Sequence, residues 1–145
     1  MRIVIVAVGK IKERGLRELI DEYLARIRRH VPCDEIELRE GKHVEAALRG
    51  AIPEQAHTVA LEVDGRSMTS EQLAAFIAER GTERKGVVTF LIGGADGLPP
   101  ALSRSADTRL SLSRLTFAHR VARVVLAEQL YRAVSIWRGD PYHRA

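Results

Sequence analysis

Apolar and polar residues alternate in blocks along this chain, and the blocks predict strands that are each followed by a helix. Continuous apolar runs rich in β-branched residues are typical of strands in a parallel sheet, whereas apolar residues three or four positions apart are typical of helices. Such runs predict strands at residues 2–8 and 86–92, and alternation of apolar and polar residues predicts a short strand at 33–39. Further strands are expected at residues 58–63 and 108–112. The helical spacing predicts helices at residues 16–27, 44–51, 70–80 and 118–137, with a short one at Pro99 and Pro100. This alternation indicates an α/β fold with a mainly parallel sheet flanked by helices.

Local signals predict where some of these elements begin and end. Asp64 and Gly65 form a turn pair, which predicts the end of the third strand. Ser70 is the predicted N-cap of the helix that follows. Two interpretations stay open before the last helix: Thr116 is its N-cap, or Thr116 belongs to a loop that binds a ligand.

The last predicted helix carries apolar residues on more than one face, among them Val121, Val125, Val134 and Trp137. A helix that is apolar on two faces must be covered twice. The sheet can cover one face, and either a second copy of the chain or other parts of the same chain can cover the second. We expect the second copy, in a homodimer packed through this helix.

Length and composition favour one domain, residues 1–145, because 145 residues with 46% apolar content can bury a core. Arg2 interrupts the first apolar run, which argues against a signal peptide, and no run approaches the roughly 20 apolar residues of a membrane span. Cys33 is the single cysteine, which excludes an internal disulfide and a cysteine metal cluster. We therefore expect a cytoplasmic protein.

The net charge of +4 comes from the last third of the chain. Residues 1–100 hold 15 basic and 16 acidic side chains, whereas residues 101–145 hold eight arginines, no lysine and three acids. Guanidinium groups suit phosphates, and a local basic field attracts polyanions. The distribution fits a nucleic-acid partner and, equally well, a solvated helix face.

Two loops have features of a small-molecule site. The segment LIGGADGLP, residues 91–99, follows an apolar run with glycines that let a ligand approach the backbone, although a structural turn explains it as well. It is neither the dinucleotide fingerprint nor the phosphate-loop motif. The segment SLSRLTF, residues 111–117, runs from a strand end into a polar loop, and such loops bind ligands in open α/β sheets. Its backbone groups could hydrogen-bond a base such as adenine.

The end of the chain gathers polar chemistry. Tyr142, His143 and Arg144 could stack on a base, move a proton and hold a phosphate, or they form a frayed terminus. Glu128 and Arg132 stand four apart on the last helix, where they form either an ordinary helical ion pair or a polar site facing a substrate.

Two other chemistries lack support in the sequence. The five histidines are scattered without a His-x-x-x-His pair, so no metal site is expected. The Gly-x-Ser-x-Gly elbow of serine nucleophiles is absent as well.

Four segments together resemble the ribosomal large-subunit methyltransferase H family. They are VAVGK at residues 6–10, LIGGADGL at 91–98, SLSRLTFAHRVARVVLAEQLYRA at 111–133 and DPYHR at 140–144. Their order, their spacing and the chain length match that family end to end, and the long final segment is the most specific of the four.

The resemblance implies a SPOUT methyltransferase fold whose C-terminal part is threaded into a trefoil knot that forms the cofactor pocket. It further implies a homodimer that uses S-adenosylmethionine. The implied reaction is methylation of N3 of pseudouridine 1915 in helix 69 of 23S rRNA, on the assembled ribosome.

Carried over position by position, the resemblance also implies site residues. The implied cofactor-binding residues are Leu61, Gly93, Leu112, Ser113, Arg114, Leu115, Thr116 and Phe117. The pseudouridine N3–H must lose its proton before nitrogen attacks, so a base or a cationic neighbour is needed. The candidate catalytic residues are His143 and Glu128 as base, Arg132 and Arg144 for anion or phosphate stabilisation, and Tyr142 beside them in a tail that reaches a partner subunit.

Two segments depart from the family pattern. Ala118 stands where the family usually has a proline before the histidine, and the GGADG turn replaces a more common turn sequence. Neither change removes a side chain that the chemistry requires. Two alternatives stay open: a methyltransferase of the same fold that acts on another RNA such as tRNA, and a non-catalytic ribosome-binding dimer.

Overall fold

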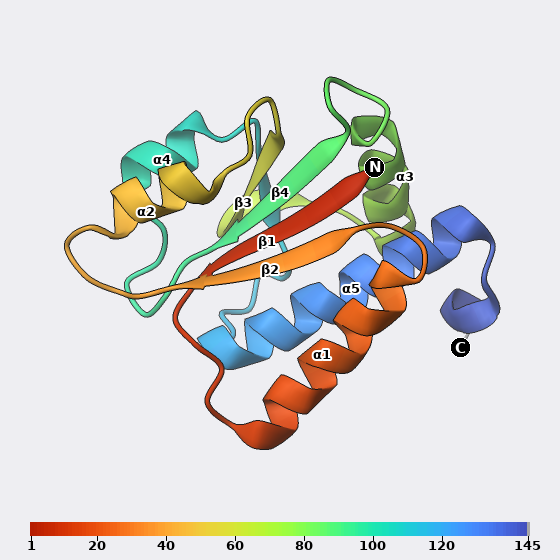
Figure 1. The fold of residues 1–145 in the computed structure, drawn as a ribbon, viewed down its shortest axis with the longest axis horizontal. Helices are drawn as coiled ribbons and strands as arrows, with labels where there is room; N and C mark the ends of the chain where they lie inside the picture. The colour runs from red at the N-terminus through yellow and green to blue at the C-terminus, as the bar shows by residue number, and fades with distance from the viewer. Residues whose placement is uncertain (145) are drawn as a thin grey trace.

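A five-stranded, all-parallel sheet forms the centre of the protein in a computed structural model that describes residues 1–144 (Figure 1). Ala145, the last residue of the predicted domain, lies outside the described residues. The strand order is β2-β1-β4-β3-β5. The strands are β1 (Arg2–Val8), β2 (Cys33–Leu38), β3 (His57–Ser67), β4 (Val87–Ile92) and β5 (Thr108–Ser111). The predicted α/β class with a parallel sheet is confirmed.

Helices cover both faces of the sheet and produce three layers (Figure 1). One face carries α1, α3 and α5, and the opposite face carries α2 and α4. The helices are α1 (Arg14–Arg28), α2 (Val44–Ala51), α3 (Ser70–Arg80), α4 (Pro100–Ser105) and α5 (His119–Arg138), followed by the 3₁₀ turn η1 (Pro141–Arg144).

The alternation of side chains along β1 shows why the apolar runs are continuous. Ile3 and Ile5 pack into the core on the side of α1, α3 and α5. Val4 and Val6 pack into the second core, beneath α2 and α4. Because successive side chains of a strand point to opposite faces, a strand covered on both faces needs apolar residues at every position.

The predicted turn at Asp64 and Gly65 is wrong, because β3 continues through both residues. Leu61 and Arg66 both pair with Leu110 of β5, so the segment between them bulges out of the ladder and then rejoins it. At Gly65 a Cβ atom would come within 2.8 Å of the β5 backbone. The glycine therefore permits close approach of two strands here and does not end one.

Both predicted N-caps need correction. Thr69 caps α3 in place of Ser70: its Oγ1 accepts from the Gln72 backbone N–H at 3.0 Å, and the Gln72 Oε1 accepts from the Thr69 N–H at 2.8 Å. This reciprocal pair satisfies two free N–H groups of the first turn. Ala118 is the N-cap residue of α5 and makes no side-chain cap, so Thr116 does not cap that helix.

The two apolar faces of α5 are partly covered within the chain. The helix lies between α1 and α3 and contacts both of them. Leu126, Leu130 and Val134 are fully buried there. Val121 and Trp137 nevertheless remain 43% exposed each.

Candidate functional site

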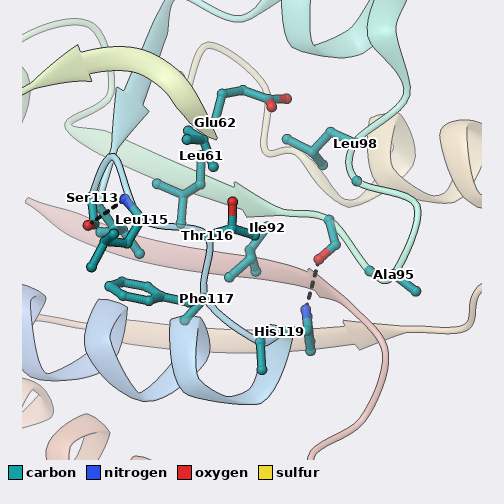
Figure 2. A pocket seen from close by; sticks show the side chains of 17 residues that line it. Leu61, Glu62, Ile92, Ala95, Leu98, Ser113, Leu115, Thr116, Phe117 and His119 are labelled. Carbon is teal, nitrogen blue, oxygen red and sulfur yellow. Dashed lines mark hydrogen bonds between the residues drawn. The ribbon is translucent and has the colours of Figure 1, made fainter.

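A cavity of about 440 Å³ opens at the carboxyl ends of β3, β4 and β5 (Figure 2). We call it the strand-end cavity. It is lined by residues 61–63, 92–95, 97–98, 112–113, 115–119 and 122. Its volume lies within the range of about 300–1,000 Å³ that is usual for small-molecule sites. Its position is the one at which open α/β sheets bind ligands.

The bulge in β3 supplies one wall of the cavity. Leu61, Glu62 and Val63 lie where the strand leaves its ladder with β5, which turns them toward the cavity and away from the sheet. Glu62 is the only carboxylate among the described lining residues. The wall is therefore mostly apolar and carries one negative charge.

The glycine-rich loop after β4 supplies a second wall. A Cβ atom at Gly93 would collide with the backbone of Gly97, so the chain turns back on itself more tightly than any other residue allows. Glu40 braces the tip of this loop, because its Oε1 accepts a hydrogen bond from the Ala95 backbone N–H at 2.8 Å. A side chain at Gly94 would collide with the same carboxylate.

The loop after β5 supplies the third wall, and much of its backbone is available to a ligand. Ser113 organises it: Ser111 Oγ donates to the Ser113 carbonyl at 2.9 Å, and the Leu115 N–H donates to Ser113 Oγ at 3.0 Å. In the described part of the chain, residues 113–117 make no backbone–backbone hydrogen bond. Because backbone N–H and C=O groups need partners, this loop can bind a planar polar ligand through its main chain.

The floor of the cavity rests on a buried ionic network. His119 Nδ1 lies 2.8 Å from the Gly93 carbonyl oxygen (Figure 2). Its Nε2 lies 3.4 Å from Arg123 Nη1. The Arg123 side chain is only 1% exposed. Its Nη2 donates to the carboxylates of Glu35 and Glu37 at 2.6 and 2.7 Å.

Arg17 of α1 balances the second carboxylate charge. Its guanidinium lies 2.6 Å from Glu35 and 3.2 Å from Glu37. Burial by itself raises the pKa of Glu37, but hydrogen bonds from Arg123 and from the Ile11 backbone N–H outweigh burial, so the pKa lies below its ordinary value. Glu37 therefore stays ionised opposite the two guanidinium groups.

The cavity contains all but one of the eight predicted cofactor-binding residues. Those that line it are Leu61, Gly93, Leu112, Ser113, Leu115, Thr116 and Phe117. Arg114 belongs to the same loop but is exposed and does not line the cavity. Sequence reasoning missed Glu62 and Arg123; the four-residue spacing of His119 and Arg123 on one helix was the available signal for the second.

The structure brings together three of the five candidate catalytic residues, Glu128, Arg132 and Tyr142, which we call the tail cluster. Arg132 Nη2 lies 3.1 Å from Glu128 Oε2, and the Tyr142 hydroxyl donates to the same oxygen at 3.1 Å. The Tyr142 ring packs against Tyr131 with centroids 4.6 Å apart. Burial, together with the hydrogen bond to Glu128, raises the pKa of Tyr142, which keeps this donor protonated.

His143 and Arg144 follow the cluster in η1. The Nδ1 atom of His143 is buried and has no hydrogen-bond partner among the described residues. Arg144 is exposed. Glu128 lies six residues after Ala122, the last lining residue on α5, which separates it from the cavity by about 9 Å along the helix axis at 1.5 Å per residue. Within one chain, the tail cluster and the strand-end cavity are separate places.

The described residues contain no group of His, Cys, Asp and Glu side chains that could hold a metal ion. None of the helices within residues 1–144 combines the length and apolar character needed to cross a membrane.

Comparison with known proteins defines the class and then the family. A family profile described as "Predicted SPOUT methyltransferase" matches residues 1–143. A crystal structure of a probable methyltransferase from Bordetella pertussis Tohama I has the same fold: its TM-score is 0.55 at 12% identity, over 92% of this chain and 96% of that one.

Relatives with higher identity are named Ribosomal RNA large subunit methyltransferase H. The one from Sorangium cellulosum is 53% identical over 143 residues, covering 98% of this chain and 99% of that protein. The one from Bifidobacterium animalis subsp. lactis is 43% identical, covering 99% of this chain and all of that protein. The chain belongs to the SPOUT methyltransferases and, among them, to the ribosomal RNA large subunit methyltransferase H family.

Proposed function

We propose that this protein transfers a methyl group from S-adenosylmethionine to N3 of a pseudouridine in helix 69 of 23S rRNA, on the assembled ribosome in the cytoplasm. The observation that carries the proposal is the strand-end cavity, whose three walls contain seven of the eight residues that the family resemblance assigns to the cofactor. The names of the relatives support ribosomal RNA as the acceptor.

The cavity has the chemistry to hold S-adenosylmethionine. Apart from the Ser113 carbonyl and the Leu115 N–H, the backbone of residues 113–117 offers donors and acceptors for the adenine edge. Apolar side chains such as Leu61 and Ile92 offer contact to its faces. Glu62 adds the one negative charge, which suits a ligand that carries a sulfonium. When bound, the cofactor supplies an activated methyl group, so the protein's task is mainly to position donor and acceptor.

In this proposal the tail provides the acceptor side of the site. Glu128 is already engaged by Arg132 and Tyr142, which suits it to orienting the tail more than to taking a proton. The His143 ring makes no hydrogen bond or ion pair among the described residues, so it is the better candidate for the base that accepts the N3 proton. Arg144 is exposed and free to meet a phosphate.

The same proposal includes a homodimer, in which the tail of one copy faces the cavity of the other. Two observations support it. Leu115 at the cavity and Val121 on the first turn of α5 are apolar and exposed, by 73% and 43%. The tail cluster begins about 9 Å along α5 beyond the last lining residue of its own cavity, so a second copy is the simple way to bring the two together.

The reaction can be tested with radiolabelled S-adenosylmethionine and three acceptors: intact 70S ribosomes from a strain that lacks this enzyme, free 23S rRNA and bulk tRNA. We expect label in 23S rRNA from intact ribosomes only, at a residue identified as N3-methylpseudouridine. Label in tRNA would support the methyltransferase activity but contradict 23S rRNA as the acceptor. Cofactor binding without label in any RNA would favour a non-catalytic ribosome-binding dimer.

Variants of the tail separate its role from that of the cavity. We expect His143→Ala and Arg144→Ala to reduce turnover on ribosomes by about 10²-fold or more, the scale of general acid–base catalysis. Cofactor affinity, measured by calorimetry, should stay within about twofold of the unmodified protein. Arg49→Ala, which removes an exposed arginine on α2, is the matched control and should change neither quantity. Equal loss of turnover and of cofactor affinity would contradict this division of labour.

A further inference from the structure

His119 makes two hydrogen bonds that together fix which of its ring nitrogens carries the proton. Its Nδ1 faces the Gly93 carbonyl oxygen at 2.8 Å, and a carbonyl oxygen can only accept. Its Nε2 faces Arg123 Nη1 at 3.4 Å, and a guanidinium nitrogen can only donate. The arrangement requires a neutral imidazole with the proton on Nδ1.

The guanidinium that imposes this tautomer is itself immobilised. Arg123 Nη1 also donates to the Gly9 carbonyl at 3.1 Å, so its two N–H groups meet Gly9 and His119. The two N–H groups of Nη2 meet Glu35 and Glu37. Four donors thus meet four acceptors in a side chain that is 1% exposed, which leaves Arg123 no other orientation.

The carbonyl that His119 holds belongs to the first residue of the glycine-rich wall. Gly93 follows β4 and begins the loop whose tip is held by the hydrogen bond from the Ala95 N–H to Glu40. His119 and Glu40 therefore hold the loop at two points, its base and its tip. His119 also lines the cavity (Figure 2). Ala118 and Ala122, at the N-terminal end of α5, line it as well.

We propose that His119 is a positioning residue: held as the Nδ1–H tautomer by Arg123, it fixes the Gly93 carbonyl and with it the wall of the strand-end cavity that receives the methyl donor. This inference rests on the proposed function, because it assigns the cavity to S-adenosylmethionine. On this proposal the buried network of Arg123, Glu35 and Glu37 contributes to ligand binding as well as to the stability of the fold.

The tautomer can be read directly from long-range ¹H–¹⁵N correlation spectra of the uniformly ¹⁵N-labelled protein. The ring signals of His119 are assigned by their loss in His119→Asn. We expect the pattern of a neutral imidazole protonated at Nδ1. A ring protonated at Nε2 would overturn the proposal, and this measurement requires no ligand.

Calorimetric titration with S-adenosylmethionine tests the positioning. His119→Leu removes the donor and should weaken binding by about tenfold, the value of one lost hydrogen bond. His119→Asn keeps an N–H donor near the position of Nδ1 and should bind within about threefold of the unmodified protein. His43→Leu, an exposed histidine before α2, is the matched control and should bind normally.

The outcomes separate this inference from the proposed function. If the unmodified protein binds S-adenosylmethionine and His119→Leu binds equally well, the positioning role is overturned and the proposed function stands. If the unmodified protein binds none, the proposed function fails and takes this role with it. Equal weakening in His119→Leu and His119→Asn, with unchanged melting temperatures, would show that the ring shape and not the hydrogen bond matters, and would also overturn the inference.

Discussion

Arg123 is a charged residue on the face of α5 that the apolar pattern predicts to be buried in the core. In the sequence it is one of eight arginines in the last third of the chain. From their number alone, these arginines are expected to contact either nucleic-acid phosphates or solvent. Its partners Glu35 and Glu37 are about 90 residues away in β2, so no local pattern can reveal the pairing. The lining residue Gly93, by contrast, directly follows β4, whose end the sequence pattern does predict.

Replacing Arg123 with Met should destabilise the fold by about 3–5 kcal/mol, because two buried carboxylates would lose a partner. Urea unfolding of the two proteins measures the difference. Arg120→Met is the matched control, because Arg120 lies on the same helix with its side chain 58% exposed, and it should cost no more than about 1 kcal/mol. A loss below 1 kcal/mol for Arg123→Met would mean that Arg17 alone balances the carboxylates.

The lowered pKa of Glu37 predicts that the free energy of unfolding decreases at acidic pH. Its pKa in the folded protein lies below the ordinary value of 4.5, so it binds protons more readily when unfolded. Its contribution to stability is therefore complete above about pH 4.5 and is lost as the pH falls from there through the lower folded pKa. Urea unfolding between pH 3 and pH 7 should show a steeper acid loss for the unmodified protein than for Glu37→Gln. Glu54→Gln, at an exposed position, should keep the original slope.

At the scale of elements, the sequence pattern predicts the strands and helices well, but it does not predict their irregularities. Predicted and observed bounds agree to within a residue or two for β1, β2, β4, β5 and α2, because buried strands and amphipathic helices have different periods. The bulge in β3 was missed, since Asp64 and Gly65 have the composition of a turn whether the strand ends or rejoins. Because that bulge forms a wall of the cavity, the wrong prediction of the strand end concerns the candidate site itself.

Two glycine substitutions distinguish a required glycine from a tolerated one. Gly65→Ala should destabilise the protein by about 1–3 kcal/mol, because the added methyl group meets the β5 backbone. Gly50→Ala should stabilise it by about 0.5–1 kcal/mol, since Gly50 lies inside α2 and nothing lies near its Cβ position. Thermal unfolding should show a lower melting temperature for Gly65→Ala and a higher one for Gly50→Ala. A change in the same direction for both variants would refute this account of the bulge.

At the scale of the whole molecule, two expectations reach beyond what periodicity can predict. Threading of the C-terminal segment into a trefoil knot stays a prediction, because a hydrophobic pattern describes which face is buried and not the path by which the chain arrives. The homodimer stays a prediction as well. The order β2-β1-β4-β3-β5 was not predicted either, because the hydrophobic pattern of a strand does not specify which strand lies beside it.

A charge on the exposed apolar residues of α5 should separate the proposed dimer. We expect Val121→Glu and Trp137→Glu to sediment as monomers while keeping the circular dichroism of the unmodified protein. Methylation of ribosomes should fall with dimer content. Leu19→Glu, on the exposed side of α1, is the matched control and should leave both quantities unchanged. A dimer that survives both α5 substitutions would place the interface elsewhere.

The distance in sequence between Arg123 and its carboxylates has a consequence for how the protein is made. During synthesis Glu35 and Glu37 leave the ribosome early, and their main partner emerges only after about 85 further residues. Until then Arg17 supplies one guanidinium to these two carboxylates, so one of their two negative charges lacks its partner. The nascent chain therefore cannot close its core before α5 is complete, and the helix made last is the one that ends the exposure of the strands made first.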